Sequence, residues 1–141
     1  MTPRPEMTPT TRPTAEPVSF PTDPRGLVIE PLHAHEFAAQ RNAHLVLTAP
    51  GATRGNHYHH TGTEVALVLG PALVRYRDLE QVVEHDLPAG VAYRFVFPAG
   101  VTHAMKNTGD APMIILSFNT EPHDPARPDV ARDVLIEPGN G

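Results

Sequence analysis

Nine short runs of β-forming residues, separated by turns rich in glycine and proline, fill the chain between residues 27 and 118. Turn signals such as Pro50-Gly51, Gly70-Pro71 and Pro98-Ala99-Gly100 separate them. The runs are Leu27–Glu30, Leu45–Thr48, Thr53–His60, Val65–Leu69, Ala72–Arg77, Val82–His85, Tyr93–Phe97, His103–Asn107 and Met113–Phe118. Many short strands at this spacing predict an all-β sandwich or barrel. The one helix-like segment is about residues 33–40.

The chain divides into an arm and a domain. Residues 1–24 are rich in proline, threonine and charge and offer almost nothing to bury. Such a composition does not offset the entropy lost on ordering, so we expect a flexible or extended N-terminal arm. The remaining residues, 25–141, have the length of one domain with one core.

Composition excludes several classes of partner and site. The formal charge is -5, and the ten arginines and the single lysine are scattered, which argues against a nucleic-acid surface. Cysteine is absent, so a metal would be held by nitrogen and oxygen ligands. No signal-peptide core or bilayer-spanning apolar run is visible, so we expect a soluble, cytoplasmic protein without a membrane partner.

Two histidines and a glutamate lie close together in the segment before residue 65, and a third histidine follows a Pro-x-Gly turn. His57 and His59 are two apart, so a strand directs both side chains to one face. The Thr61-Gly62-Thr63 turn lets the next strand restart with Glu64 inward. His103 comes from a strand across the barrel. Three imidazoles and a carboxylate that converge predict a divalent transition-metal site.

The other aromatic and histidine side chains give weaker signals. His60 has the opposite parity to the ligand pair and is expected on the exterior. Strand alternation turns either Tyr76 or its two arginine neighbours inward, and an inward tyrosine is a candidate acid or base. Tyr93 is most simply a core aromatic and a second candidate base. Five histidines show no convergent pattern and are expected to be solvated or at interfaces: His33, His35, His44, His85 and His123.

The ligand candidates fall in two motifs of a known superfamily. Gly51-x5-His57-x-His59-x4-Glu64-x5-Gly70 resembles the first cupin motif, and Pro98-x-Gly100-x2-His103-x3-Asn107 resembles the second. The resemblance implies a single jelly-roll type β-barrel with His57, His59, Glu64 and His103 as ligands of one divalent metal. Zinc is the first expectation, with iron, nickel or manganese as alternatives.

A closer resemblance covers roughly residues 45–129. Residues 50–61, 106–109 and 124–129 are similar to the C-terminal zinc-binding cupin domain of bifunctional capsular-polysaccharide enzymes. Those enzymes join a nucleotide-sugar reductase domain to a cupin that acts on a 4-keto-sugar nucleotide by epimerisation. The resemblance implies a small-molecule ligand of the nucleotide-sugar class, and we expect a homodimer.

Three functions stay open at this point. The first is a keto-sugar-nucleotide epimerase or isomerase, in which a metal polarises a carbonyl and a base removes the neighbouring proton. Tyr76, Tyr93 or a metal-bound hydroxide are the candidate bases. The second is an Fe(II) dioxygenase, because three histidines and a glutamate also suit iron. The third is a non-catalytic cupin that binds or senses a small molecule.

Overall fold

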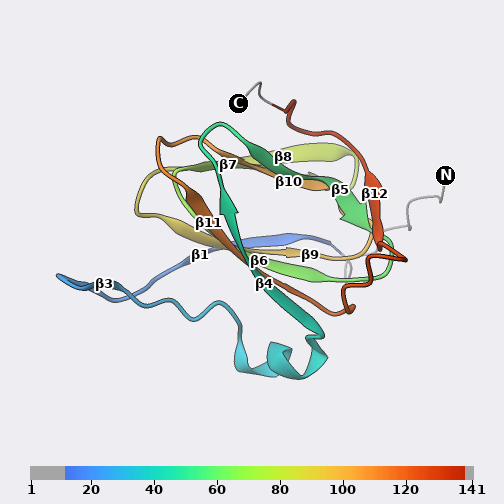
Figure 1. Ribbon diagram of the computed structural model, residues 1–141, viewed down its shortest axis with the longest axis horizontal. Coiled ribbons are helices and arrows are strands. Elements are labelled where there is room, and N and C mark those ends of the chain that lie inside the picture. The colour runs from blue at the N-terminus through green and yellow to red at the C-terminus, as the bar shows by residue number, and fades with distance from the viewer. Residues whose placement is uncertain (1–11, 139–141) are drawn as a thin grey trace.

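The computed structural model describes residues 12–138, and its body is two five-stranded antiparallel sheets that face each other (Figure 1). The first sheet has the order β1 (Thr14–Val18), β9 (Ala92–Phe97), β6 (Glu64–Leu69), β11 (Met113–Asn119) and β4 (Asn42–Thr48). The second has the order β12 (Val130–Arg132), β5 (Thr53–His59), β10 (His103–Asn107), β7 (Ala72–Asp78) and β8 (Gln81–Leu87). The predicted all-β, jelly-roll type of fold is confirmed.

The expected runs and the observed strands differ mainly near the N-terminus. Eight of the nine runs coincide with strands β4 to β11, but Leu27–Glu30 does not form a strand of its own. Instead β2 (Thr22–Asp23) and β3 (Gly26–Leu27) make a small hairpin that projects from the body (Figure 1). The helix-like segment is a 3₁₀ helix, η2 (Ala34–Ala39). Within residues 12–138 no helix has the length and apolar character needed to span a bilayer.

The N-terminal arm is the main correction to the sequence prediction. Residues 1–11 lie outside the described part of the chain, but Thr14–Val18 forms the edge strand β1, paired with β9 from Thr14 opposite Val96 to Val18 opposite Ala92. The expectation of a flexible arm is therefore wrong for this segment. Its proline, Pro17, is tolerated because an edge strand needs only one set of backbone hydrogen bonds.

A buried arginine ties this edge strand to the segment that follows. Arg94, in β9, points to the outer face of the first sheet, and its side chain is only 6% exposed. Its guanidinium pairs with Glu16 of β1 at 2.7 Å and with Glu36 of η2, and it also donates a hydrogen bond to the carbonyl of Pro31. Because a buried charge needs such partners, the pairing fixes residues 31–36 over the sheet.

The hydrophobic core lies between the inner faces of the two sheets. Phe95, Phe97, Ile115, Val68 and Val74 are fully buried there. Strand alternation sends every second residue into this space, so β6, β7, β9 and β11 each contribute two or three side chains to the core. The same alternation directs polar side chains inward near the end of the sandwich where β5 ends and β6 begins.

The C-terminal segment crosses the outer face of the second sheet and is held by one asparagine of β5. The Asn56 side chain accepts hydrogen bonds from the backbone amides of Leu135 and Ile136 and donates one to the carbonyl of Ile136. Ile136 is buried. The carboxylate of Asp133 adds an ion pair with Arg77 at 3.1 Å. Strands β5 and β7 of the body thus anchor this tail.

Candidate metal and substrate site

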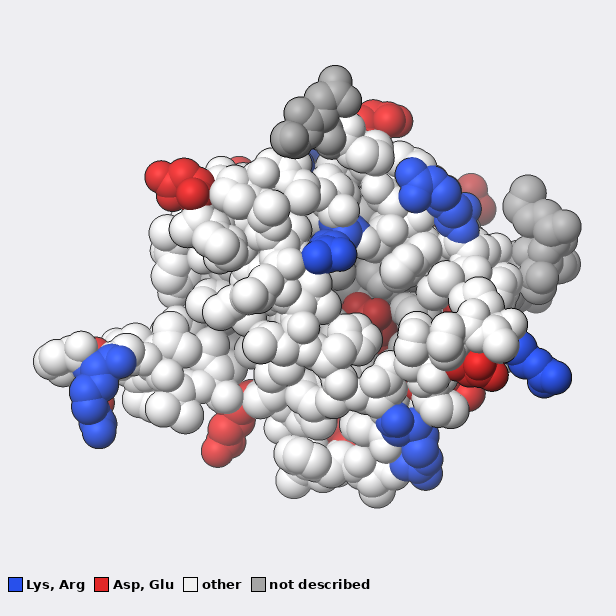
Figure 2. Space-filling model, in the orientation of Figure 1, with Lys and Arg blue, Asp and Glu red and all other residues white. Residues whose placement is uncertain are grey.

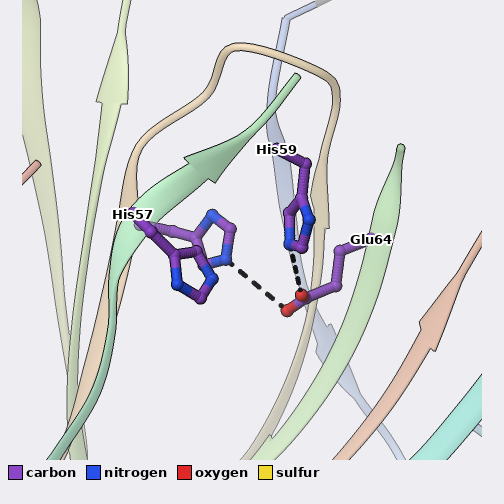
Figure 3. Close-up of side chains that lie close together, drawn as sticks. His57, His59 and Glu64 are labelled. Atoms are coloured by element: carbon purple, nitrogen blue, oxygen red, sulfur yellow. Dashed lines mark hydrogen bonds and ion pairs between the residues drawn. The ribbon is translucent and has the colours of Figure 1, made fainter. Parts of the chain in front are cut away.

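The structure brings the four predicted ligands together between the sheets. His57 and His59 lie at the C-terminal end of strand β5. Glu64 is the first residue of β6, and His103 is the first residue of β10. One ligand atom from each residue lies within 4.8 Å of those of the others. Figure 3 shows His57, His59 and Glu64 pointing toward one another. His59 Nε2 is 3.1 Å from Glu64 Oε1, and His103 Nε2 is 3.7 Å from Glu64 Oε2.

An aspartate from the far end of the chain holds the turn that aims Glu64 inward. The carboxylate of Asp129 accepts hydrogen bonds from the backbone amides of Thr61 and Gly62 and from the Thr61 hydroxyl. It also lies 4.0 Å from His59 Nδ1. The turn between the histidine pair and the glutamate is therefore fixed from outside, which explains how β6 restarts with Glu64 facing His59.

The hydrogen bonding of His103 tests whether this cluster fits a metal. Its Nδ1–H donates to the carbonyl of Val101 at 3.0 Å, so a neutral ring presents an unprotonated Nε2. That Nε2 is fully buried and has no hydrogen-bond partner within 3.5 Å among the described residues; the carboxylate of Glu64 lies beside it at 3.7 Å. A buried lone pair held in one orientation by the other ring nitrogen is the usual arrangement of a metal-ligating histidine. The residues fit a divalent metal.

A β-bulge in β5 changes which side chains face the site. Gly55 and Asn56 both have positive φ, +84° and +57°, and the pairing of β5 with β10 shifts register at this point. His57 lies opposite His103, yet Arg54 lies opposite Met105, on the same inner face. Simple alternation would send Arg54 outward, because it is three residues from His57. Bulges near functional sites redirect side chains in this way.

Two cavities meet at the cluster. One, of about 250 Å³, has at its mouth the residues around Glu121, Asp124 and Asp129. The other, of about 160 Å³, reaches Arg54, His103 and Met105. Both are lined by His44, His57 and Glu64, so the ligand cluster lies where they join. On this face of the molecule Figure 2 shows a hollow with acidic atoms at its base and basic side chains on its rim.

Burial and mutual charge set the protonation of the cluster. Burial, with repulsion from His103 and His59, lowers the pKa of His57 to about 4 although Glu64 acts in the opposite direction. Burial alone would raise the pKa of Glu64, but charge attraction and hydrogen bonding from His103 and His59 bring it well below its usual range. At neutral pH the cluster therefore contains an ionised carboxylate and a neutral His57, which are the forms that bind metal.

The lowered pKa of His57 predicts an acid-sensitive fold in the metal-free protein. The unfolded chain takes up this proton near pH 6.5 and the folded chain only near pH 4, so stability falls as pH drops between these values. We expect a loss of about 2–3 kcal/mol between pH 7.5 and 4.5. Thermal melts of metal-free protein measure it, with His57→Gln as the control that removes this component. A slope that is the same in both proteins would contradict the assignment.

The two predicted catalytic tyrosines lie beside the core and do not line either cavity at the cluster. Tyr76 is buried next to His103 across the sheet, and its hydroxyl is 3.1 Å from His85 Nε2. Burial and the nearby charge of Asp78 raise the pKa of Tyr76, so the phenol keeps its proton at neutral pH. Tyr93 stacks on Phe95. A catalytic role for either tyrosine stays a prediction.

The sequence prediction is correct for His60, but it does not place Arg54 and His44 at the cavities. His60 lies against Tyr58, away from the ligand pair, as alternation predicts. Arg54 was missed because the bulge reverses its parity. His44, expected to be solvated or at an interface, is exposed and also lines both cavities. The sequence feature that indicates this position is alternation along β4: His44 is two residues from Val46 and four from Thr48, whose side chains face the space between the sheets.

Comparison with known proteins gives the family of this chain. Residues 21–131 match the polysaccharide biosynthesis C-terminal domain family. A UDP-2-acetamido-2,6-beta-L-arabino-hexul-4-ose reductase of Pseudomonas aeruginosa is 31% identical over 116 residues, which are 79% of this chain and 30% of that protein. The chain thus spans under a third of this relative's length.

Solved structures show the same fold. The capsular polysaccharide assembling protein CapF of Staphylococcus aureus matches with a TM-score of 0.61 and 28% identity over 85% of this chain and 32% of CapF. The 3,4-ketoisomerase QdtA of Thermoanaerobacterium thermosaccharolyticum, solved with TDP-4-keto-6-deoxyglucose, matches with a TM-score of 0.64 and 14% identity over 86% of this chain and 88% of QdtA. On the match of residues 21–131, the chain belongs to the polysaccharide biosynthesis C-terminal domain family.

Proposed function

We propose that this protein is a metal-dependent epimerase or isomerase of a keto-sugar nucleotide. The observation that carries the proposal is the gathering of His57, His59, Glu64 and His103 where two cavities join. The buried His103 Nε2, 3.7 Å from the ionised carboxylate of Glu64, is suited to hold a cation together with it. Three nitrogens and one oxygen suit zinc first, and iron, nickel or manganese as alternatives. Such a metal, when bound, supplies a Lewis acid that polarises a carbonyl oxygen.

The substrate class rests on the family and on the charges of the site. The relatives include a reductase named for a UDP-linked hexulose and a ketoisomerase solved with a TDP-linked keto sugar. A keto sugar brings the carbonyl that this chemistry needs, and the nucleotide brings a diphosphate. Within the described residues, Arg54 is the one arginine or lysine that lines either cavity, whereas three carboxylates line the mouth of the larger one. We therefore infer that the diphosphate would lie on the Arg54 side.

The protein residues around the reacting sugar then have separate tasks. Asp129 holds the turn that positions Glu64, and the Val101 carbonyl holds the ring of His103. The walls of the smaller cavity, with Met105 and Ile115, exclude water from the enediolate that forms when a carbon next to the carbonyl loses its proton. Return of the proton at the same or the neighbouring carbon gives the epimer or the isomer.

The test is solvent exchange on a defined substrate. Protein loaded with zinc is incubated in D₂O with TDP-4-keto-6-deoxyglucose or its UDP counterpart, and NMR follows deuterium at the carbons beside the carbonyl. We expect exchange that depends on metal and is abolished by a chelator. Oxygen uptake by iron-loaded protein without exchange would instead identify the dioxygenase alternative. Nucleotide-sugar binding without exchange would identify the sensor.

We also propose a homodimer formed through the outer face of the first sheet. Leu45 and Leu47 of β4 are 63% and 58% exposed there, beside the half-exposed Ile114 of β11. Neighbouring exposed aliphatic side chains on one sheet are typical of an interface. Light scattering should give twice the chain mass, and Leu47→Glu should return it to the monomer. The matched control, Val82→Glu on the second sheet, should stay dimeric. A monomeric wild type would contradict this proposal.

A further inference from the structure

We propose that His44 is the catalytic residue that moves the proton to and from the sugar, from the sheet opposite the β5 and β10 histidines. This inference rests on the proposed function, because it names the acid-base group of that same site. Neither the cupin motifs nor the predicted tyrosines include His44.

The strand β4 places the imidazole of His44 on the inner face of the first sheet. Val46 of the same strand packs against the core and Thr48 is fully buried, whereas Leu45 and Leu47 face outward. Side chains two apart share a face, so His44 points inward with Val46 and Thr48. Because β4 is the edge of its sheet, His44 also stays open to solvent. A group that exchanges protons with water and faces the site meets both needs of an acid-base catalyst.

The cavities give His44 a unique position relative to the cluster. Among residues 12–138, three line both cavities: the proposed ligands His57 and Glu64, and His44. The strand β11 lies between β4 and β6, and its Ser117 pairs with His44 on one side and with Ala66, two residues from Glu64, on the other. The backbones of His44 and Glu64 are therefore roughly 12 Å apart. Both side chains therefore project from the same face of the first sheet toward β5 and β10, and a sugar ring bound at the cluster would lie between that face and the second sheet. The carbonyl would face the metal ligands and a neighbouring C–H would face His44.

The proton transfer balances without any further reactant. The neutral imidazole of His44 accepts the proton of the carbon beside the carbonyl. The electron pair of that C–H bond forms the new C=C bond, and the carbonyl π pair moves to the carbonyl oxygen as an enediolate. The imidazolium then delivers a proton to the former carbonyl carbon while the hydroxyl proton of the neighbouring carbon passes to the enediolate oxygen, and the new carbonyl forms at that neighbouring carbon. Return of the proton to the original carbon from the same face regenerates the substrate and, in D₂O, exchanges its hydrogen.

The experiment compares His44→Gln with His123→Gln, a second exposed histidine that lines only the mouth of the larger cavity. Zinc-loaded proteins are incubated with TDP-4-keto-6-deoxyglucose or its UDP counterpart in D₂O. We expect His44→Gln to lower the exchange rate by roughly 10²–10⁴-fold. Its zinc content, melting curve and calorimetric Kd for the same sugar nucleotide should stay at wild-type values. His44→Ala should recover part of the rate on addition of imidazole, which a structural role would not produce. His123→Gln should stay within a few-fold of wild type.

Two failures are distinguishable. Exchange in wild type that His44→Gln leaves unchanged would overturn the role of His44 and leave the proposed function intact. Wild-type protein that holds zinc but neither binds nor exchanges these sugar nucleotides would overturn the proposed function, and the role of His44 with it.

Discussion

His59→Ala and His103→Ala should each purify without tightly bound metal, whereas His60→Ala should keep it. His59 and His103 both place a nitrogen within reach of Glu64, and the Nε2 of His103 has no other partner among residues 12–138. His60 lies next to these residues in the sequence but packs against Tyr58 instead. Removing a ligand should lower metal affinity by more than the roughly 10–100-fold that loss of a group behind a ligand produces.

The measurement is metal content by mass spectrometry after dialysis, followed by zinc titration at pH 7.5. Glu64→Gln removes the negative charge of the side chain at nearly constant shape. We expect it to lose tightly bound metal as the histidine variants do. His57→Ala should do the same, because its pKa of about 4 leaves the ring free to bind metal at neutral pH. Equal metal loss from His60→Ala and His59→Ala would contradict the site, since alternation along β5 would then not decide which ring binds.

Gly55→Ala should be the most destabilising of the glycine substitutions near the site. A Cβ at this position would lie 2.7 Å from the carbonyl oxygen of His103 and 3.2 Å from the Cα of Ala104, and both are backbone atoms that have little freedom to move. The residue also has φ +84°, which costs a side chain about 1–2 kcal/mol. Together with overpacking we expect a loss of about 2–5 kcal/mol, or on the order of 10 °C in Tm.

Gly51→Ala is the matched control, because Gly51 has φ +79° but nothing within 4 Å of a Cβ. Gly51→Ala should lower the free energy of unfolding only by the cost of a side chain at positive φ, about 1–2 kcal/mol. The difference between the two variants measures the close approach of β5 to β10. Gly55→Ala should also weaken zinc binding, since its Cβ would push on the backbone of the ligand His103 itself. Equal melting temperatures for the two variants would show that the bulge is not packed as described.

The sequence predicted the ligand cluster because each step used a short-range rule. Strand alternation predicts that His57 and His59 share a face. A turn signal at residues 61–63 lets the next strand begin with Glu64 inward, and a Pro-x-Gly turn predicts that His103 lies on another strand. These rules hold wherever a strand is regular. The eight main strands were found for the same reason, since each joins a β-forming run to a clear turn.

The parts that were missed depend on irregularity or on distant partners. A bulge at Gly55 and Asn56 reverses parity, so counting residues places Arg54 on the wrong face. The strand β1 looks like a disordered arm because its composition is polar and rich in proline, yet pairing with β9 and the buried Arg94 order it. No local pattern records a partner that lies about 80 residues away.

The asparagine that holds the tail also belongs to the bulge that shapes the site, so we expect the tail and the bulge to open together in local unfolding. Asn56 belongs to the bulge that aims Arg54, and its side chain binds the amides of Leu135 and Ile136. Opening of the tail would remove the partners that hold Asn56 in its left-handed conformation and would let the bulge relax. The hydrogen-exchange rates of the Leu135 and Ile136 amides should therefore report how rigidly the bulge holds Arg54 at the cavity.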